Sequence, residues 1–435
     1  MPKMKYSGIE WIKEIPDNWD KIKIKNLCSK IYAGGTPSTD VFEYWDGNIP
    51  WLPSGACHDN IINEANIFIT EKGYKNSSTK LIPKNTTIIA MTGATCANVG
   101  YITFDSCANQ SVTAFINNHN KLFSKYLFYT LQGAREYILT YQTGGAQAGI
   151  NVENCRNLII PLTGIAEQKL IAEFLDEKVD TIDNIICDLN NQIEILNKYR
   201  KQLITETITT GLNKNVKYKD SNIDWMGKIP DHWEIKRLKY LGSARNGLTY
   251  EPEDQSEEGL LVLRSSNIQN GKLCLDDNVY VDMKVPKNII LKKNDLLICS
   301  RNGSRNLIGK NILIDERMEG NTYGAFMCVF RSQYNKYIHY VLNSNIFDHY
   351  LNTFLTSTIN QLTNNNLYTI KIPIPMDIEE QDKIVEYLDT KCKIIDELIE
   401  NKQKQKERME QYKKSVIYEY VTGKKRVEGA EELYG

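Results

Sequence analysis

The stretch EQKLIAEFLDEKVDTIDNII at residues 167–186 returns as EQDKIVEYLDTKCKIIDELI at residues 380–399. In each copy a proline precedes the stretch, and almost no glycine or proline interrupts it before Gly211 in the first copy and Gly423 in the second. These start and stop signals predict two helices of about 45 residues, each roughly 65 Å long at a rise of about 1.5 Å per residue.

A second phrase repeats at almost the same distance along the chain. SGIEWIKEIPDNW at residues 7–19 returns as SNIDWMGKIPDHW at residues 221–233, so that the chain consists of two copies of one plan. We interpret the repeated tryptophans, Trp11, Trp19, Trp225 and Trp233, as packing residues that join each domain to its helix. The predicted segments are residues 1–162 (N-terminal segment and first domain), 163–212 (central helix), 213–376 (linker and second domain) and 377–435 (C-terminal helix and tail).

Between the repeated phrases the two copies diverge, but a skeleton is common to both. Short apolar runs broken by Gly, Asn and Asp, such as TTIIAM at residues 86–91 and LLVLR at residues 260–264, are typical of strands, and helical stretches are interspersed among them. Aligning the copies pairs Gly93 with Gly303 and Gly100 with Gly309. Each middle region is therefore predicted to be an α+β domain of about 130–140 residues.

The two predicted helices carry an apolar seam. Apolar residues step by threes and fours, which predicts that the helices pack on each other as an antiparallel, coiled-coil-like pair. The seam residues are Ile182, Ile186, Leu189, Ile193, Leu196 and Leu203 in the first helix and Ile395, Ile399, Met409 and Val416 in the second. The second seam is polar at Lys402 and Lys406, which leaves the contact there open. The fold class expected is α+β, with two domains, two long antiparallel helices and a pseudo-two-fold internal repeat.

Signatures of catalysis are absent from the sequence. No GxxxxGK[ST] loop, strand-following GxGxxG turn or GxSxG elbow is present, and the five histidines and ten cysteines show no zinc-ligand spacing. We expect no catalytic residue, no metal site, and cysteines that are reduced and mostly buried. No apolar run approaches the ~20 residues of a membrane span and no signal peptide is apparent, which predicts a cytoplasmic protein without membrane contact.

The formal net charge of −1 limits how this chain could bind nucleic acid. A nucleic-acid-binding surface is usually basic, so positive charge would have to be concentrated on a small part of this protein.

Variable loops supply the candidate contacts for DNA. Residues 301–310 contain two Arg and two Asn, which read guanine and adenine in the major groove, and Lys310, which together with backbone N–H groups suits phosphate. A polar hairpin loop, an Asx turn or a cap is the structural alternative at each position. The candidates are Ser54, His58, Thr92, Thr95, Asn98, Gln110 and Gln147 in the first copy, and Arg264, Asn267, Arg301, Asn302, Ser304, Arg305, Asn306, Lys310, Tyr323 and Gln361 in the second.

The two boundary phrases, the helices that begin with Glu-Gln, and the helix endings LITETITTGL and VIYEYVTGK together resemble the specificity subunits of type I restriction–modification systems. The resemblance covers essentially the whole chain. It implies two target-recognition domains, each reading one half of a split target on double-stranded DNA, and a helix pair that fixes the gap between the halves.

The resemblance also implies partners. Two methyltransferase subunits would dock on the helices and use S-adenosylmethionine to methylate adenine at N6, and motor-nuclease subunits would use ATP and Mg²⁺ for cleavage. This chain itself would carry no cofactor. Two other classes remain open: a stand-alone enzyme with an unfamiliar site, and a scaffold that holds two proteins apart. The target bases, the gap length and the presence of a nuclease subunit cannot be deduced from the sequence.

Overall fold

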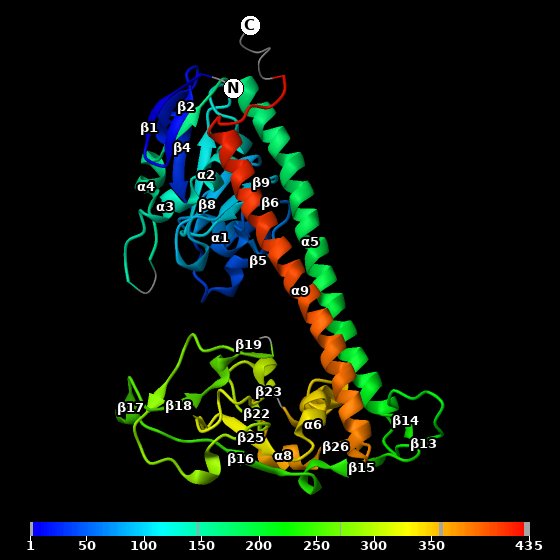
Figure 1. Cartoon of the computed structure of the whole chain (residues 1–435). Coiled ribbons are helices and arrows are strands. Elements are labelled where there is room, and N and C mark those ends of the chain that lie inside the picture. Colours follow the sequence, from blue (N-terminus) through cyan, green and yellow to red (C-terminus); the bar gives the residue numbers. More distant parts are fainter. Residues whose placement is uncertain (1–2, 146–147, 270, 356–359, 430–435) are drawn as a thin grey trace. The chain divides into compact units, whose positions relative to one another are not determined.

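The computed structural model describes residues 3–145, 148–269, 271–355 and 360–429 (Figure 1). The chain divides into two compact units, each built from an α+β domain and from parts of both long helices. Unit 1 is residues 1–190 with 404–435, and unit 2 is residues 191–403. These units cut across both helices, whereas the sequence assigns each helix to a segment of its own. The bounds of the four predicted segments therefore stay a prediction.

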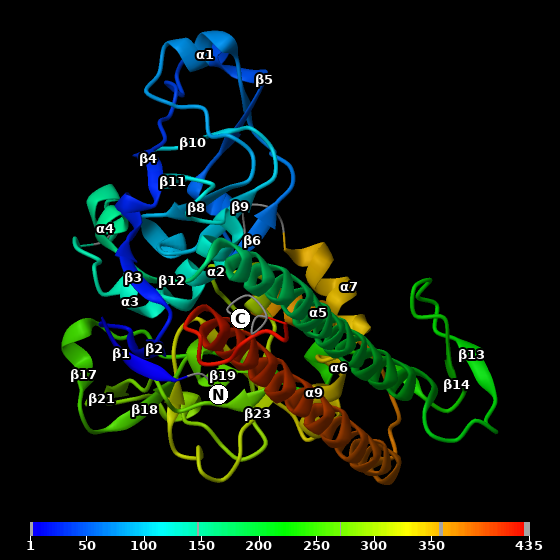
Figure 2. The same cartoon turned by 90° about the horizontal axis from the view of Figure 1, so that it is seen from above.

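The two long helices are α5 (Ile165–Thr210) and α9 (Ile378–Val421), as the repeated phrase predicts. In unit 1 the beginning of α5 packs against the end of α9, where the rings of Phe174 and Tyr420 lie 4.4 Å apart. In unit 2 the end of α5 packs against the beginning of α9, so the two helices are antiparallel (Figure 2). Both helices end at a glycine, Gly211 with φ +70° and Gly423 with φ +69°, in the left-handed conformation that commonly closes a helix.

The domain of unit 1 is built around a mixed five-stranded sheet whose inner strands carry the apolar runs of the sequence. The strand order is β4 (Cys28–Ala33), β11 (Val112–Asn117), β8 (Thr86–Ala90), β9 (Val99–Ile102) and β6 (Asn60–Ile62). A second sheet contains β10 (Cys107–Ala108), β5 (Trp45–Leu52) and β7 (Phe68–Ile69). Two-stranded pairs are formed by β1 (Met4–Ile9) with β2 (Ile12–Pro16) and by β12 (Ile159–Leu162) with β3 (Asp20–Lys23). The helices are α1 (Glu71–Lys75), α2 (Ser124–Gly133), α3 (Arg135–Leu139) and α4 (Val152–Asn157).

The domain of unit 2 follows the same plan with two four-stranded sheets. One sheet has the order β16 (Ser243–Asn246), β25 (Met327–Arg331), β22 (Leu296–Cys299) and β23 (Asn311–Leu313). The other has the order β17 (Gln255–Ser256), β21 (Tyr280–Val281), β18 (Leu260–Leu263) and β24 (Thr322–Tyr323). Pairs are formed by β13 (Tyr218–Asp220) with β14 (Lys228–Pro230), β15 (Glu234–Arg237) with β26 (Lys371–Ile374), and β19 (Ile268–Gln269) with β20 (Lys272–Leu273). The helices are α6 (Asn335–Val341), α7 (Asn345–Phe354) and α8 (Asn364–Thr369).

Equivalent tryptophans attach each domain to a long helix. The buried Trp19 donates its indole N–H to Glu167 at the start of α5 (3.0 Å), and the buried Trp233 donates to Glu380 at the start of α9 (3.0 Å). The packing role predicted for these two tryptophans is confirmed. Of the remaining pair, Trp11 lies beside Tyr418 of α9, whereas Trp225 stacks on the imidazole of His349 in α7 rather than on a long helix.

Equivalent tyrosines reach the other ends of the helices. The hydroxyl of Tyr126 in α2 donates to Pro161 O (3.0 Å) and to Val421 O in the last turn of α9 (3.3 Å). The hydroxyl of Tyr337 in α6 donates to Pro373 O (2.9 Å) and to Ile208 O in the last turn of α5 (3.1 Å). Each domain is thus bonded to the first turn of one long helix and the last turn of the other, which is why the boundary phrases repeat while the middle regions diverge.

Candidate nucleic-acid interface

In unit 1, backbone hydrogen bonds hold both sides of the loop between β8 and β9. Met91 N donates to Ser111 O (2.7 Å) and Met91 O accepts from Ile150 N (2.8 Å). Thr92 and Gly149 form a backbone bridge one residue further along. The variable residues of this loop therefore start from a fixed backbone frame.

Unit 2 carries the same frame between β22 and β23. Ser300 N donates to Phe326 O (3.0 Å), and Ser300 O accepts from Leu362 N (2.7 Å). Arg301 and Gln361 form the backbone bridge. The shared bonds equate five pairs of positions: Met91 with Ser300, Ser111 with Phe326, Ile150 with Leu362, Thr92 with Arg301, and Gly149 with Gln361.

The loop is three residues longer in unit 2. It closes where Ala97 N donates to Ala90 O (2.9 Å) in unit 1 and where Gly309 N donates to Cys299 O (2.8 Å) in unit 2. Ala97 and Gly309 both have positive φ, +66° and +84°. The sequence pairing of Gly100 with Gly309 is therefore wrong, because a longer loop shifts the alignment by three residues and makes Ala97 the counterpart of Gly309.

Two candidate contacts, Asn98 and Lys310, follow this closing position and hold the frame. Asn98 Nδ2 donates to Cys57 O (3.1 Å), beside the short 3₁₀ turn Ser54–Ala56. The Lys310 ammonium donates to Ile268 O (2.8 Å) and to Ser265 O, beside the equivalent turn Ser265–Asn267. Burial lowers the pKa of the Lys310 ammonium. Both side chains donate hydrogen bonds to backbone carbonyls, which are structural roles and not contacts with DNA.

Two further candidates, Asn267 and Tyr323, lie where DNA cannot touch them in this structure. Both are fully buried. The amide of Asn267 donates to Cys274 O (3.0 Å) and Asp277 O (3.2 Å), and its Oδ1 accepts from Arg264 N (2.9 Å). The hydroxyl of Tyr323 donates to Arg245 O (3.2 Å). The counterpart of Tyr323 in unit 1 is Ala108, since β24 pairs with β18 as β10 pairs with β5.

The other candidates of unit 2 gather at the loop. Arg301, Ser304, Arg305 and Asn306 are exposed, whereas Arg264 is half-buried and forms an ion pair with Asp277 (2.8 Å). Asn302 donates to Ser265 Oγ (3.0 Å) and accepts from Ser304 N (2.9 Å). A hollow of about 710 Å³ opens here, and it is lined by Ser265, Arg301, Asn302, Gly303, Phe326, Asn360 and Gln361.

The candidates of unit 1 are neutral and less exposed. Ser54, Thr92 and Thr95 are half-buried, while His58 and Gln110 are exposed. Gln110 Oε1 accepts a hydrogen bond from Thr36. Gln147 lies outside the described residues. The two units thus present unlike side chains from one backbone frame.

Positive charge gathers at a recess along β4, the edge strand of unit 1. The recess, about 650 Å³ in volume, is lined by Lys25, Lys30, Lys80 and Arg156 together with Tyr32 and Tyr74. The ammonium of Lys80 lies 5.1 Å from the ring centre of Tyr32. Four basic side chains thus line one recess, and one of them, Arg156, is paired with Glu153 (3.6 Å).

The predicted seam residues all lie on the inner side of the helices. Ile182, Leu189, Ile395 and Val416 are buried, and Ile186, Ile193, Leu196, Leu203, Ile399 and Met409 are half-buried. Lys402 and Lys406, which interrupt the seam, are half-buried as well.

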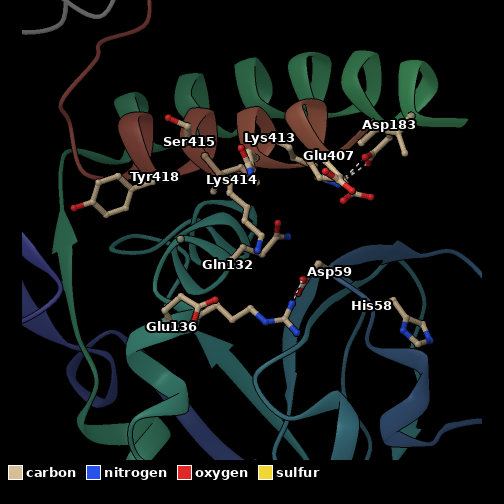
Figure 3. Close-up of a pocket in the computed structure, with 16 residues that line it drawn as sticks. His58, Asp59, Gln132, Glu136, Asp183, Glu407, Lys413, Lys414, Ser415 and Tyr418 are labelled. Atoms are coloured by element: carbon tan, nitrogen blue, oxygen red, sulfur yellow. Dashed lines mark hydrogen bonds and ion pairs between the residues drawn. The ribbon is translucent and has the colours of Figure 1, made fainter. Parts of the chain in front are cut away.

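Ion pairs at equivalent positions join the helices within each unit. Lys413 of α9 pairs with Asp183 of α5 in unit 1 (2.7 Å), and Arg200 of α5 pairs with Asp396 of α9 in unit 2 (2.8 Å). The first pair lines a groove of about 830 Å³ between the domain of unit 1 and its helices (Figure 3). In Figure 3, the domain side of this groove carries His58 and Asp59, and Asp59 is paired with Arg135.

Large apolar side chains are exposed at equivalent places on both helices. Ile185 is 40% exposed and its counterpart Leu398 is 45% exposed, while Tyr199 and Tyr412 are 55% and 53% exposed. Unit 1 presents Ile185 with Tyr412, and unit 2 presents Leu398 with Tyr199. Exposed apolar side chains thus recur at equivalent positions of the two helices.

No group of three or more His, Cys, Asp or Glu side chains among the described residues could hold a metal ion. None of the helices in the described part of the chain has an apolar stretch that could cross a membrane.

The two halves match one family model separately. The model, described as the type I restriction modification DNA specificity domain, matches residues 16–195 and again residues 230–409. The chain belongs to this family. It is a type I specificity subunit, a non-catalytic subunit.

Relatives of this specificity subunit are similar along its length. The type I restriction enzyme MjaVIII specificity subunit of Methanocaldococcus jannaschii is 29% identical over 95% of this chain and 94% of the relative. The EcoR124I/EcoR124II specificity subunit of Escherichia coli is 34% identical over 39% of this chain and 43% of the relative. In a solved structure concerned with complex assembly and conformational transition of the type I R-M system, one chain superposes with a TM-score of 0.70 at 14% identity, covering 94% of this chain and 99% of that chain, which shows the shared fold.

Sequence reasoning missed one feature of the specificity subunit's loop surface. Phe326 is 59% exposed, and the Arg301 guanidinium lies 5.1 Å from its ring centre. The run FMCVF reads as a buried strand, and only the backbone bond from Phe326 to Ser300 places the first residue of that run at the loop. No local signal in the sequence identifies it.

Proposed function

We propose that this specificity subunit reads a bipartite target on double-stranded DNA, with one α+β domain contacting each half in the major groove. The observation that supports this most strongly is the shared backbone frame, which carries Thr92, Ser111 and Gly149 in unit 1 but Arg301, Phe326 and Gln361 in unit 2. One frame with unlike side chains is what two different half-sites require, because base edges are distinguished by their patterns of hydrogen-bond donors and acceptors.

The proposed contact surface is smaller than the sequence predicts. It keeps Ser54, His58, Thr92, Thr95 and Gln110 in unit 1 and Arg264, Arg301, Asn302, Ser304, Arg305, Asn306 and Gln361 in unit 2. In the proposed arrangement residues 1–162 and 213–376 are the target-recognition segments, and residues 163–212 and 377–435 provide the helix pair that sets the gap.

We further propose that the helix pair docks two methyltransferase subunits, which bring S-adenosylmethionine and methylate adenine at N6. Motor-nuclease subunits with ATP and Mg²⁺ would join the same complex for cleavage. Support for two equivalent docking sites comes from the exposed apolar residues Ile185 with Tyr412 in unit 1 and Leu398 with Tyr199 in unit 2.

Methylation mapping tests the proposed reading of DNA. The chain is expressed with its methyltransferase partner, and N6-methyladenine is mapped at base resolution. The expected target is two short blocks of defined bases separated by a gap of fixed length. Thr92→Arg should alter one block and Arg305→Ala the other. A single continuous motif, or methylation that does not depend on this chain, would contradict the proposal.

Salt dependence separates DNA reading from a scaffold role. The complex should bind target DNA with a log affinity that falls linearly with log salt, since each neutralised phosphate releases counterions. A scaffold between two proteins predicts no such DNA binding. A stand-alone enzyme predicts turnover by the purified chain when only DNA, S-adenosylmethionine and Mg²⁺ are supplied.

Tyr412→Glu tests docking in unit 1 and Tyr199→Glu tests it in unit 2. Each substitution places a charge on an exposed apolar position, so each should remove one methyltransferase subunit and leave the other bound, as measured by native mass spectrometry. Tyr240→Glu is a matched control, since Tyr240 is also exposed but lies in the domain of unit 2. Retention of both subunits in the Tyr412 and Tyr199 variants would refute this docking surface.

The spacing role is tested by lengthening both helices. An insertion after Ile208 would disturb packing, because Ile208 is buried and its carbonyl accepts from Tyr337. Four residues inserted after Asn190 in α5 and four after Gln403 in α9 fall at the boundary of the two units instead. They add about 6 Å, close to the rise of two base pairs. The gap in the methylated motif should lengthen while both blocks stay the same; an unchanged gap would refute the spacing role.

A further inference from the structure

The hollow at the loop of unit 2 holds a charged side chain without a counterion. Arg301 is exposed, and no acidic side chain in the described part of the chain forms an ion pair with it. Its guanidinium lies 5.1 Å from the ring centre of Phe326. An aromatic face stabilises a guanidinium and limits its rotamers, so the five donors of Arg301 are presented in a restricted direction.

The backbone beneath this guanidinium is fixed as well. Arg301 N donates to Phe326 O (3.0 Å), and Arg301 is bridged to Gln361 across the antiparallel backbone. Asn360 Nδ2 donates to Gly303 O (3.3 Å) and ties the segment that carries Gln361 to the loop. Arg301 is therefore held on both sides, and the unsatisfied hydrogen-bonding capacity of its side chain faces a hollow of about 710 Å³.

Gln361 supplies a second planar group beside Arg301. Its side chain makes no hydrogen bond to another described residue, whereas the neighbouring Asn302 is engaged by Ser265 and by Ser304. Residues directly opposite each other in an antiparallel bridge have Cβ atoms about 4.5–5.5 Å apart. A guanidinium fork and a carboxamide thus extend from directly opposed backbone positions and line the same hollow, and both groups can form paired hydrogen bonds with the edge of a purine.

The equivalent positions of unit 1 carry none of these groups. Thr92 replaces Arg301, Gly149 replaces Gln361, and Ser111 replaces Phe326. The difference lies in the side chains and not in the frame. It assigns a distinct recognition chemistry to unit 2.

We infer that Arg301 and Gln361 are the base-reading pair of unit 2, and that they select a half-site with a guanine, read by Arg301, next to an adenine, read by Gln361. Phe326 is a positioning residue that orients the guanidinium. Arg pairs with guanine O6 and N7, and Gln pairs with adenine N6 and N7, in the major groove. The inference rests on the proposed function, because it names the bases read by one of the two proposed domains.

The test uses the full-length chain in complex with its methyltransferase. Affinity is measured for a set of duplexes in which each base pair of the target is changed in turn. Arg301→Ala should weaken binding to the unchanged target by roughly 5- to 150-fold and remove the preference for guanine at one position of one block. Gln361→Ala should remove the preference for adenine at the adjacent position, and the other block should keep its preferences in both variants.

Conservative and control variants separate base reading from folding. Arg301→Lys keeps the charge but loses the planar fork, so the slope of log affinity against log salt should stay the same while the guanine preference is weakened, since a lysine ammonium can still donate to guanine. Phe326→Leu should weaken the guanine preference less than Arg301→Ala. Arg317→Ala is the matched control, because Arg317 is exposed in the same unit and is paired with Asp315 (2.6 Å). It should change neither block.

Retention of the guanine preference in Arg301→Ala, or a block altered by Arg301→Ala that contains no guanine, would overturn the inference and leave a bipartite target in place. A wild-type complex without a bipartite target would instead refute the proposed function. If Arg301→Ala lowers the melting temperature, Arg301→Met, which keeps the length of the side chain without its donors, decides: a lost guanine preference at a wild-type melting temperature supports base reading, and a kept preference overturns it.

Discussion

The two tryptophans that attach the domains to the helices should differ in what they contribute to stability. The substitutions Trp19→Phe and Trp233→Phe remove the same indole N–H, and each N–H donates to a glutamate over 3.0 Å. The acceptors differ in burial. The side chain of Glu167 is 1% exposed, whereas that of Glu380 is 27% exposed and also bonds to His232 (2.9 Å).

The magnitudes follow from these surroundings. A hydrogen bond to a charged group contributes about 1.5–3 kcal/mol. The loss is larger for Glu167, because its carboxylate stays buried and out of reach of water, although Thr163 and Arg426 still pair with it. The smaller ring of phenylalanine removes a further ~1–2 kcal/mol of apolar burial at either site. Trp19→Phe should therefore cost about 3–5 kcal/mol. Trp233→Phe should cost about 2–3 kcal/mol, because water and His232 continue to solvate Glu380.

Hydrogen exchange measured by mass spectrometry along a urea series reports the two units separately, since peptides from residues 3–190 and 404–429 follow unit 1 and peptides from residues 191–403 follow unit 2. Each substitution should lower protection mainly in its own unit. Equal losses of stability for the two substitutions, or a loss below about 1 kcal/mol for Trp19→Phe, would refute the argument from burial.

Three further predictions concern single contacts. Burial, with a smaller contribution from Arg200, lowers the pKa of the His339 imidazole to about 4 from 6.5. Between pH 6.5 and 4 this proton binds the unfolded state but not the folded state. The free energy of unfolding of unit 2, measured by urea titration, should therefore fall by about 2 kcal/mol between pH 7 and pH 5, and His339→Gln should not show this fall. Gly423→Ala should lower the melting temperature more than Gly211→Ala does. Both glycines have positive φ, but a Cβ at Gly423 would lie 2.5 Å from Pro16 Cδ, whereas a Cβ at Gly211 would lie 3.2 Å from a Trp233 ring atom. Equal melting temperatures of the two variants would contradict this. Arg200→Asp and Asp396→Arg should each lower the free energy of unfolding by up to about 1 kcal/mol, and the double variant, in which the two charges are exchanged, should regain most of it. If the loss in the double variant equals the sum of the two single losses, the pair is not coupled.

The long helices and the internal repeat could be predicted because their signals are local. A Glu-Gln start, a glycine end and apolar residues at steps of three and four specify α5 and α9 without knowledge of the rest of the fold. Strands such as β8 and β18 were equally accessible, because their apolar runs are short and bounded by turn residues.

The loop chemistry was less accessible because partners distant in sequence decide it. Lys310 reads as a phosphate ligand until the carbonyls of Ser265 and Ile268, more than 40 residues away, are brought beside it. Asn267 and Tyr323 read as polar contacts until the fold buries them. The loop of unit 2 is three residues longer, and this difference could not be deduced from the sequence. An alignment that matches glycines only therefore pairs Gly309 with Gly100 instead of Ala97.

The division of the chain into units has a consequence for folding during synthesis on the ribosome. Unit 2 is one continuous segment, residues 191–403, whereas the beginning of α5 in unit 1 cannot pack on the end of α9 until that end has been synthesised. At about 5–20 residues per second, the nascent chain spends roughly 10–50 s with Leu175 and Val179 lacking their neighbours Val416 and Val421. Unit 1, whose domain is synthesised first, is therefore the last unit to be completed. During that interval the emerging polypeptide most needs protection by chaperones.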